Sequence, residues 1–238
     1  MGERKFGFLD LLYPRRCPVC GDVAMPKGAL VCPECRKRLS FIEEPVCKRC
    51  GREVPAMEME YCRDCAARKR TFDGAVALLH YDQTAQKSIA AFKYGGRPEY
   101  ADFYGEELVR RYGRQLLRWR PEAIVPVPAD RGRQRARGYN QAQVLAERLG
   151  TGLHLPVLKD VLIRRRHTQA QKELGPAARQ KNLEQAIAVS HWPPGLTRVL
   201  LADDIYTTGS TAEACTRALK QAGAQQVYGV WVCVAGAE

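Results

Sequence analysis

Hydrophobic runs alternate with stretches of helical character along the C-terminal two thirds of the chain. The runs predict strands, and they occupy residues 72–81, 123–128, 157–163, 199–202 and 227–234. The stretches between them predict helices, which we expect at residues 83–94, 100–119, 141–149 and 212–222. Residues 199–202 are wholly apolar, as in a strand that is buried on both faces of a sheet. These elements predict an α/β core domain.

The first 65 residues lack this pattern and contain eight of the ten cysteines. The eight form four Cys-x-x-Cys pairs at regular intervals, which are Cys17 and Cys20, Cys32 and Cys35, Cys47 and Cys50, and Cys62 and Cys65. Glycine follows the first and the third pair, at Gly21 and Gly51. The segment therefore consists of two tandem units of about 30 residues, each with four cysteines.

Four thiolates are the ligand set of a structural, tetrahedral Zn²⁺ site. The glycine supplies the positive φ that lets backbone amides point at the sulfur atoms. Disulfides require an oxidising compartment, for which nothing in the sequence speaks, and a redox Cys-x-x-Cys would occur singly. We therefore expect two structural zinc sites, with sequential pairing of the Cys pairs favoured over interleaved pairing. The expected domains are a double zinc ribbon at 1–68 and the core domain at 69–238.

Charge and hydropathy indicate which kinds of molecule the protein could bind. The net charge is +12, and residues 130–181 hold 12 Lys and Arg against 4 Asp and Glu. Such a segment binds polyphosphate or a nucleic-acid backbone, and charge alone does not choose between them. No apolar run approaches the roughly 20 residues that cross a bilayer, and the N-terminus lacks a signal-peptide pattern. We expect a cytoplasmic protein without membrane insertion.

The most informative stretch follows the run 199–202. Two acids come first, Asp203 and Asp204. A hydroxyl-rich turn then leads into a helix, and its residues are Thr207, Thr208, Gly209, Ser210 and Thr211. A strand, turn and helix of this kind direct backbone N–H groups and the positive end of the helix dipole at one place, where phosphate binds. Carboxylates accept hydrogen bonds from a diol. The stretch predicts a ribose 5-phosphate site with Mg²⁺ nearby, rather than solvated acids before a capped helix.

Residues 199–211 (Val-Leu-Leu-Ala-Asp-Asp-Ile-Tyr-Thr-Thr-Gly-Ser-Thr) resemble the phosphoribosyl pyrophosphate (PRPP) signature of type I phosphoribosyltransferases. Within that superfamily the chain is similar to the ComF family. The similar segments are the Cys-rich N-terminal part, Phe-Lys-Tyr-Gly-Gly at 92–96, Pro-Val-Pro at 126–128 and Arg-Gly-Tyr-Asn-Gln at 137–141. The resemblance implies the type I phosphoribosyltransferase fold, a mostly parallel sheet flanked by helices. It also implies a small N-terminal double zinc ribbon with four cysteines around each zinc.

The resemblance also implies roles for individual residues. Asp203 and Asp204 are the implied catalytic acids, and residues 207–211 the implied phosphate site. The implied pyrophosphate residues, which act together with Mg²⁺, are Arg131, Arg137 and Gly138. A lid that closes over PRPP is implied at Arg166, Gln171 and Arg179, although helix-capping or solvent-facing roles suit these three nearly as well. Lys93 either reaches the cleft or only balances the dipole of its helix.

The implied function is transfer of a phosphoribosyl group from PRPP, with release of pyrophosphate, in a protein of competence and DNA uptake. Single-stranded DNA and a helicase-like ATPase of competence are the implied partners. The alternative is a non-catalytic module that handles single-stranded DNA and responds to PRPP. The sequence does not identify the phosphoribosyl acceptor.

Overall fold

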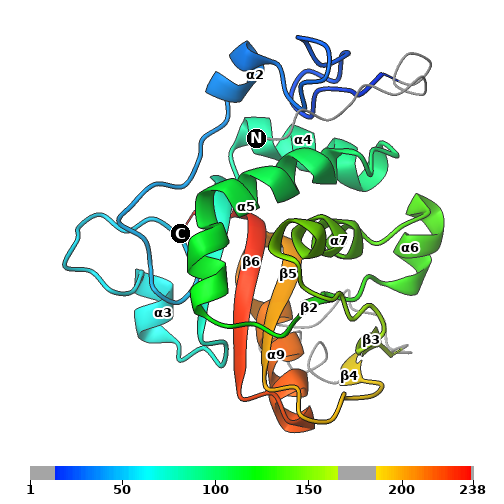
Figure 1. Cartoon of the computed structure of the whole chain (residues 1–238). Coiled ribbons are helices and arrows are strands. Elements are labelled where there is room, and N and C mark those ends of the chain that lie inside the picture. The colour runs from blue at the N-terminus through cyan, green and yellow to red at the C-terminus, as the bar shows by residue number, and fades with distance from the viewer. Residues whose placement is uncertain (1–13, 166–185, 237–238) are drawn as a thin grey trace, which may run out of the picture.

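The computed structural model describes residues 14–165 and 186–236, and a parallel sheet lies at its centre (Figure 1). The sheet has the order β1-β6-β5-β2, and every neighbouring pair is parallel. Its strands are β1 (Gly74–His80), β6 (Gln226–Val234), β5 (Arg198–Tyr206) and β2 (Ala123–Pro126). Because all four strands run in one direction, their carboxyl ends share one edge of the sheet, where open α/β sheets bind ligands.

Helices cover both faces of this sheet (Figure 1). One face is covered by α4 (Gln83–Tyr94), α5 (Tyr100–Arg118) and α7 (Gln141–Leu153), and the other by α9 (Ser210–Ala222). Alternate residues of β5 enter the two cores, with Leu200 on the α5 side and Leu201 on the α9 side. The prediction of an α/β domain with a mostly parallel, helix-flanked sheet is confirmed.

The basic segment after β2, for which the sequence predicted no element, contains a short helix. This helix, α6 (Arg131–Arg137), begins where the side chain of Asp130 accepts a hydrogen bond from Arg133 N at 3.1 Å. It ends at Gly138, whose φ of 85° is the left-handed conformation of a helix C-cap. A capping acid and a terminal glycine thus suffice to form a short helix from a segment that is otherwise polar.

The strand predicted at 157–163 is wrong as a single element. Val157 makes one isolated bridge to Ile124 of β2, and the exposed Lys159 and Asp160 then turn the chain away from the sheet. The chain next forms β3 (Leu162–Arg164), which pairs with the antiparallel β4 (Ile187–Val189) in a separate small sheet.

Two similar cysteine-rich units precede the core, which we name the first ribbon (residues 14–38) and the second ribbon (residues 44–68). Each ends in a short helix, α2 (Pro33–Lys37) or α3 (Arg63–Ala67). The segment between them joins the sheet, since Phe41 forms an antiparallel bridge with Leu79 at the outer edge of β1. Within the described residues, no helix has the length and apolarity needed to span a membrane.

Candidate functional site

The acid pair lies within β5 rather than after it, because this strand continues to Tyr206. Successive side chains of a strand point to opposite faces. Asp204 is 7% exposed and faces the α4 side, where Lys93 Nζ lies 3.0 Å from its Oδ1. Asp203 lines a narrow pocket with the residues of the turn. Lys93 therefore does more than balance a helix dipole, because it neutralises one of the two acids.

Asp203 has an unusual proton affinity. Burial, together with the neighbouring Asp204 carboxylate, raises the pKa of Asp203 to about 8, against the opposing effect of Lys93. Asp203 also accepts a hydrogen bond from the backbone N of Asp204 at 2.9 Å. A carboxyl group with this pKa is largely protonated at neutral pH, and a nearby cation or hydroxyl donor would favour its ionised form.

Residues 207–211, hereafter the phosphate loop, connect β5 to α9. Gly209 is the N-cap of α9 and has a φ of 77°, which favours glycine. A Cβ atom at Gly209 would lie 2.4 Å from the hydroxyl oxygen of Tyr206, so a larger residue has no room there. Thr208 and Ser210 share a hydrogen bond of 3.0 Å between their hydroxyl groups. The phosphate loop therefore offers hydroxyl groups together with the N-terminus of α9, as anion sites do.

The basic helix α6 follows β2, the strand next to β5. Val127 N donates to Ala202 O at 2.9 Å, so β2 ends beside Ala202, whereas β5 continues to Tyr206. Of the predicted pyrophosphate residues, Arg131 is exposed at the start of α6. Arg137, at its end, donates to Gln141 Oε1 at 2.9 Å and lies 4.5 Å above the ring of Tyr94.

The two sequence segments at 92–96 and 137–141 meet in space. The hydroxyl group of Tyr139 donates to the carbonyl oxygen of Phe92, and their rings are 6.1 Å apart. Asn140 caps α7 by accepting from Ala142 N at 3.1 Å, and its amide group donates to Val127 O at 3.0 Å. The end of α4, the end of α6 and the end of β2 therefore form one unit next to Asp204.

The eight N-terminal cysteines form two compact groups. One consists of Cys17, Cys20, Cys32 and Cys35, and the other of Cys47, Cys50, Cys62 and Cys65. The sulfur atoms of each group all lie within 4.8 Å of one another. This donor set and spacing fit one tetrahedral Zn²⁺ per group, so the prediction of two sequentially paired zinc sites is confirmed and the interleaved alternative is wrong.

One residue of the site escaped the sequence analysis. Arg52, in the second ribbon, is 6% exposed, and its Nη2 donates to the carbonyl oxygen of Thr207 at 3.4 Å. Its Nη1 lies 3.9 Å from Cys62 Sγ. The sequence held one signal that could have found it. The residue after the knuckle glycine is Asp22 in the first repeat but Arg52 in the second. The predicted lid residues Arg166, Gln171 and Arg179 lie outside the described residues.

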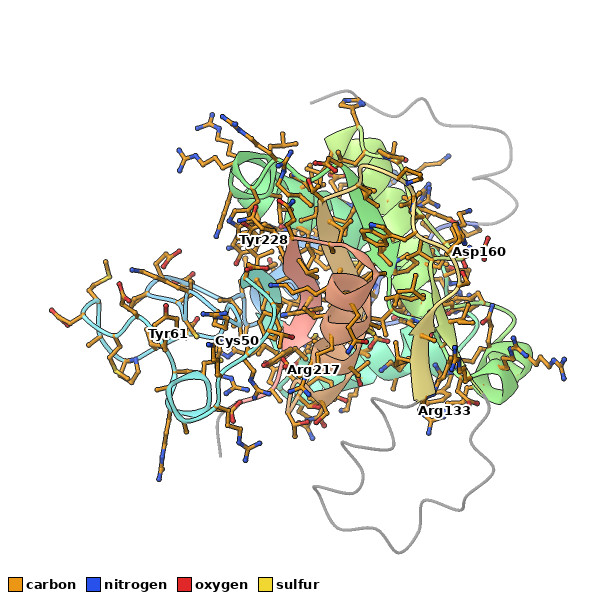
Figure 2. The ribbon with its side chains drawn as sticks, turned by 90° about the horizontal axis from the view of Figure 1, so that it is seen from below. Cys50, Tyr61, Arg133, Asp160, Arg217 and Tyr228 are labelled. Carbon is orange, nitrogen blue, oxygen red and sulfur yellow. The ribbon has the colours of Figure 1, made fainter. Side chains whose placement is uncertain are left out.

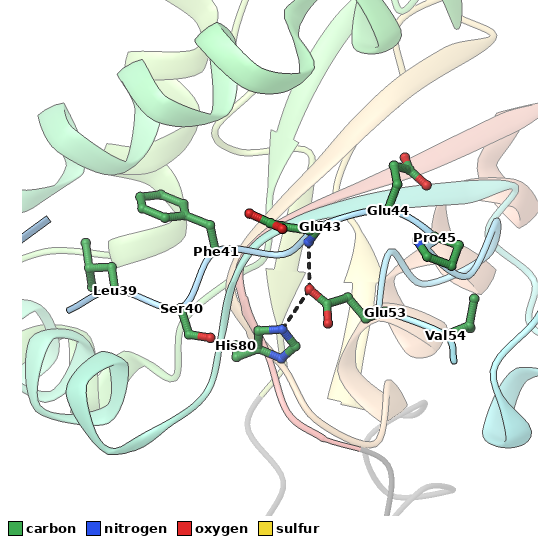
Figure 3. Close-up of a pocket in the computed structure, with 9 residues that line it drawn as sticks. All are labelled: Leu39, Ser40, Phe41, Glu43, Glu44, Pro45, Glu53, Val54 and His80. Carbon is green, nitrogen blue, oxygen red and sulfur yellow. Dashed lines mark hydrogen bonds and ion pairs between the residues drawn. The ribbon is translucent and has the colours of Figure 1, made fainter. Parts of the chain in front are cut away.

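A larger groove of about 490 Å³ lies where the segment between the ribbons and the second ribbon meet the edge of β1 (Figure 3). Two of its glutamates form hydrogen bonds or ion pairs with other groups of the protein. Glu53 accepts from Glu43 N at 2.7 Å and lies 2.9 Å from His80 Nε2, and Glu44 accepts from Val46 N at 3.1 Å. These contacts link the second ribbon to β1, so we assign the groove a structural role.

Comparison with known proteins agrees with these features. Residues 8–66 match the double zinc ribbon domain. Competence protein F of Haemophilus influenzae is 33% identical over 174 residues, covering 71% of this chain and 75% of that protein. The DNA utilization protein YhgH of Escherichia coli O157:H7 is 28% identical over 222 residues, covering 90% and 88%. The purine phosphoribosyltransferase of Pyrococcus horikoshii is a partial structural match, with a TM-score of 0.36 and 18% identity over 57% of this chain and 73% of that one. On the identity and coverage of competence protein F, the chain belongs to the ComF family.

Proposed function

We propose that this protein binds PRPP at the carboxyl end of β5 and transfers its phosphoribosyl group with release of pyrophosphate. One observation carries the proposal. Residues 203–211 pass without interruption from a buried strand, through Gly209 in the left-handed conformation, to the N-terminus of α9. In this assignment the 5′-phosphate accepts hydrogen bonds from the amides and hydroxyls of the phosphate loop.

The acids of β5 and the arginines of α6 would contact the remaining parts of PRPP, the ribose and the pyrophosphate. Asp203 and Asp204 accept hydrogen bonds from the ribose hydroxyl groups, and Arg131 and Arg137 neutralise the pyrophosphate. Carboxylate oxygens are the ligands that Mg²⁺ prefers, so Asp203 is the residue of this site that would help to hold the ion. When bound with PRPP, Mg²⁺ would supply positive charge to the leaving group.

The reaction is a displacement at the anomeric carbon. The bond from this carbon to the pyrophosphate oxygen breaks, its electron pair leaves with pyrophosphate, and an acceptor forms a new bond to the carbon. Positive charge develops on the ribose ring, where the carboxylates of β5 stabilise it. The protein otherwise contributes by fixing both ends of the sugar, because no covalent intermediate is required.

A role in DNA uptake or use follows from the relatives, of which one carries competence and another DNA utilization in its name. The second candidate function is a module that binds single-stranded DNA and uses PRPP only as a regulatory ligand. The exposed side chains of Arg131, Arg133 and Arg135 on α6 favour it, and Arg133 projects from the surface in Figure 2. A competence helicase or ATPase would then be the protein partner.

The deciding experiment measures pyrophosphate release from PRPP and Mg²⁺ with adenine, uracil, ammonia or single-stranded DNA as acceptor. We expect release with one acceptor class, and its loss in the variant Asp203→Ala/Asp204→Ala. The control is Glu43→Ala/Glu44→Ala, an exposed acid pair away from the phosphate loop. Salt-dependent binding of single-stranded DNA with no release for any acceptor would contradict the transferase and support the second function.

A further inference from the structure

A single buried guanidinium joins the second cysteine group to the phosphate loop. Arg52 is 6% exposed and reaches Thr207 O with Nη2 and Cys62 Sγ with Nη1, at 3.4 and 3.9 Å. Its Nε is buried without a hydrogen-bond partner in the described part of the chain. The structure thus places one cation between a zinc ligand and a backbone carbonyl of the loop.

Burying a guanidinium is unfavourable unless a negative charge compensates it. Among the residues that the structure describes, no carboxylate forms an ion pair with Arg52. The compensating charge is that of the cysteine group, because four thiolates around one Zn²⁺ carry a formal charge of about −2. The negative charge beside Arg52 is therefore tied to occupancy of the second cysteine group by zinc.

The aromatic residues next to the phosphate loop share one hydrophobic core with Cys47, Cys50 and Cys62 of the second ribbon. The ring of Tyr206 stacks on Trp231 at 5.5 Å and meets Phe72 edge-on at 6.0 Å. Gly209 rests on the hydroxyl group of Tyr206. Thr71, three residues after the second ribbon, donates its backbone N to Glu213 Oε2 of α9 at 3.0 Å. A displacement of the second ribbon would therefore disturb both Tyr206, which precedes the loop, and Glu213, which follows it.

We propose that Arg52 is a positioning residue that couples zinc in the second cysteine group to the conformation of the phosphate loop. It holds the Thr207 carbonyl toward the ribbon, because a carbonyl oxygen turned into the pocket would repel phosphate oxygens. The amides of residues 208–211 are then available to an anion, for which Ser210 N gives up its 3.5 Å contact with Thr208 Oγ1. The identity of that anion as PRPP rests on the proposed function, whereas the ordering of the loop does not.

Coupling of this kind is reciprocal. If zinc in the second group strengthens PRPP binding, then PRPP must strengthen the hold on that zinc by the same factor. The first group provides the internal control, because Asp22 stands at the position of Arg52 and Cys20 is exposed. Zinc in the first group should be indifferent to PRPP.

The test uses the full chain with both zinc ions and compares Arg52→Met and Arg52→Lys with the control Arg16→Met. Arg16 is an arginine of the first ribbon that donates to a backbone carbonyl, Gly21 O, at 3.0 Å. We measure the zinc count by native mass spectrometry, PRPP affinity by calorimetry, and the release of each zinc to a chelator with and without PRPP. Loop order is measured by hydrogen exchange of the Glu213 amide, which donates to Gly209 O of the loop at 2.8 Å and whose protection we take as the protection of the loop.

We expect Arg52→Met to lose amide protection in the loop and to bind PRPP about tenfold more weakly, as for the loss of a hydrogen bond from a charged group. Arg52→Lys should recover part of this loss, and Arg16→Met should behave as wild type. PRPP should slow the release of one zinc in wild type and of neither in Arg52→Met. If Arg52→Met releases its second zinc unaided, Arg52→Lys decides, and it should keep two zinc ions with reduced protection.

Unchanged loop protection and PRPP affinity in a two-zinc Arg52 variant would overturn the proposal, as would equal losses in Arg16→Met. Failure of wild type to bind PRPP would instead refute the proposed function. The hydrogen-exchange comparison would still test Arg52 in that case, because it requires no ligand.

Discussion

The two ribbons repeat one sequence pattern but stand in different surroundings. In the second ribbon Cys47 and Cys50 are 0% exposed and belong to the same hydrophobic core as Trp231, whereas Cys20 of the first ribbon is exposed. A Cβ atom at Gly51 would lie 2.9 Å from Ala77 N of β1, while one at the matching Gly21 would meet nothing within 4 Å. The second ribbon is part of the core.

The first ribbon is attached to α5 by ion pairs, while Val19, Leu30 and Val31 pack against the core on that side of the sheet. Arg36 makes two hydrogen bonds to Glu107, at 2.6 and 2.8 Å, and Arg15 pairs with Asp102. Figure 1 shows α2 above α4 and α5, while α3 lies at the other side of the sheet from α6. Figure 2, turned by 90°, likewise places Cys50 and Arg133 on opposite sides. The same metal-binding unit is therefore a surface attachment in the first ribbon and part of the core next to the phosphate loop in the second. The residues that surround each ribbon account for this difference.

Replacing one cysteine in each ribbon gives the largest expected difference. Cys50→Ser and Cys20→Ser each remove a zinc ligand, and structural zinc supplies folding free energy. We expect Cys50→Ser to lower the melting temperature of the core and to abolish PRPP binding, because its ribbon supports β1 and the phosphate loop. Cys20→Ser should lose one zinc with the core transition retained. Calorimetric melting with a zinc count measures both, and equal effects would contradict the comparison.

Alanine at the two knuckle glycines separates packing from backbone strain. Gly21 and Gly51 have φ of 80° and 75°, so both variants incur a similar conformational cost. Only Gly51→Ala also collides with β1, and overpacking of this kind costs about 1–3 kcal/mol more. Urea unfolding of the two variants tests this difference, which should vanish if the second ribbon does not pack on the strand.

The pH response of the phosphate site follows from Asp203. Its pKa rises from 3.8 to about 8, so its contribution to the stability of the ligand-free protein is present below pH 3.8 and is lost as the pH rises toward 8. PRPP with Mg²⁺ favours the ionised carboxyl group, so affinity should rise roughly fivefold from pH 7 to pH 8. Calorimetry at both values checks this, and Asp203→Asn should abolish the dependence. A flat profile in wild type would refute this role for Asp203.

The first ribbon should respond to pH in the opposite sense. Burial would raise the pKa of Glu107, but its hydrogen bonds to Arg36 and Arg110 outweigh this and lower it. The contribution of Glu107 is therefore present above pH 4.5 and is lost as the pH falls through its lowered pKa. Because Arg36 is partly exposed, we expect a coupling of only about 1 kcal/mol. A double-mutant cycle with Arg36→Ala and Glu107→Gln measures it, with PRPP affinity unchanged throughout.

The sequence predicted those features that depend on local pattern. Residues 83–94 form α4 with the expected bounds, because Asp82 caps the helix and Gly95 ends it. The fourfold Cys-x-x-Cys repeat predicted both cysteine groups, since spacing within a knuckle is set by its own backbone. The phosphate loop lies between strand and helix, as its residues indicated.

What remained unpredicted depends on contacts between distant segments. The pairing of Lys93 with Asp204 joins residues of α4 and β5, and the reach of Arg52 to Thr207 spans 155 positions. Asp203 and Asp204 point to opposite faces of the sheet because β5 continues through both of them. The sequence predicted that this strand ended at residue 202. The helix α6 was also not predicted, because its segment is polar and lacks the apolar periodicity of the other helices, although its capping residues Asp130 and Gly138 stand in the sequence.

The most direct measurement is a calorimetric titration of the two-zinc protein with PRPP and Mg²⁺ at pH 8. We expect one PRPP per chain, binding that survives in Glu43→Ala/Glu44→Ala, and no binding in Asp203→Ala/Asp204→Ala when that variant still carries both zinc ions. PRPP affinity of the Asp203/Asp204 variant equal to that of wild type, or no binding by wild type, would contradict a PRPP site at the end of β5.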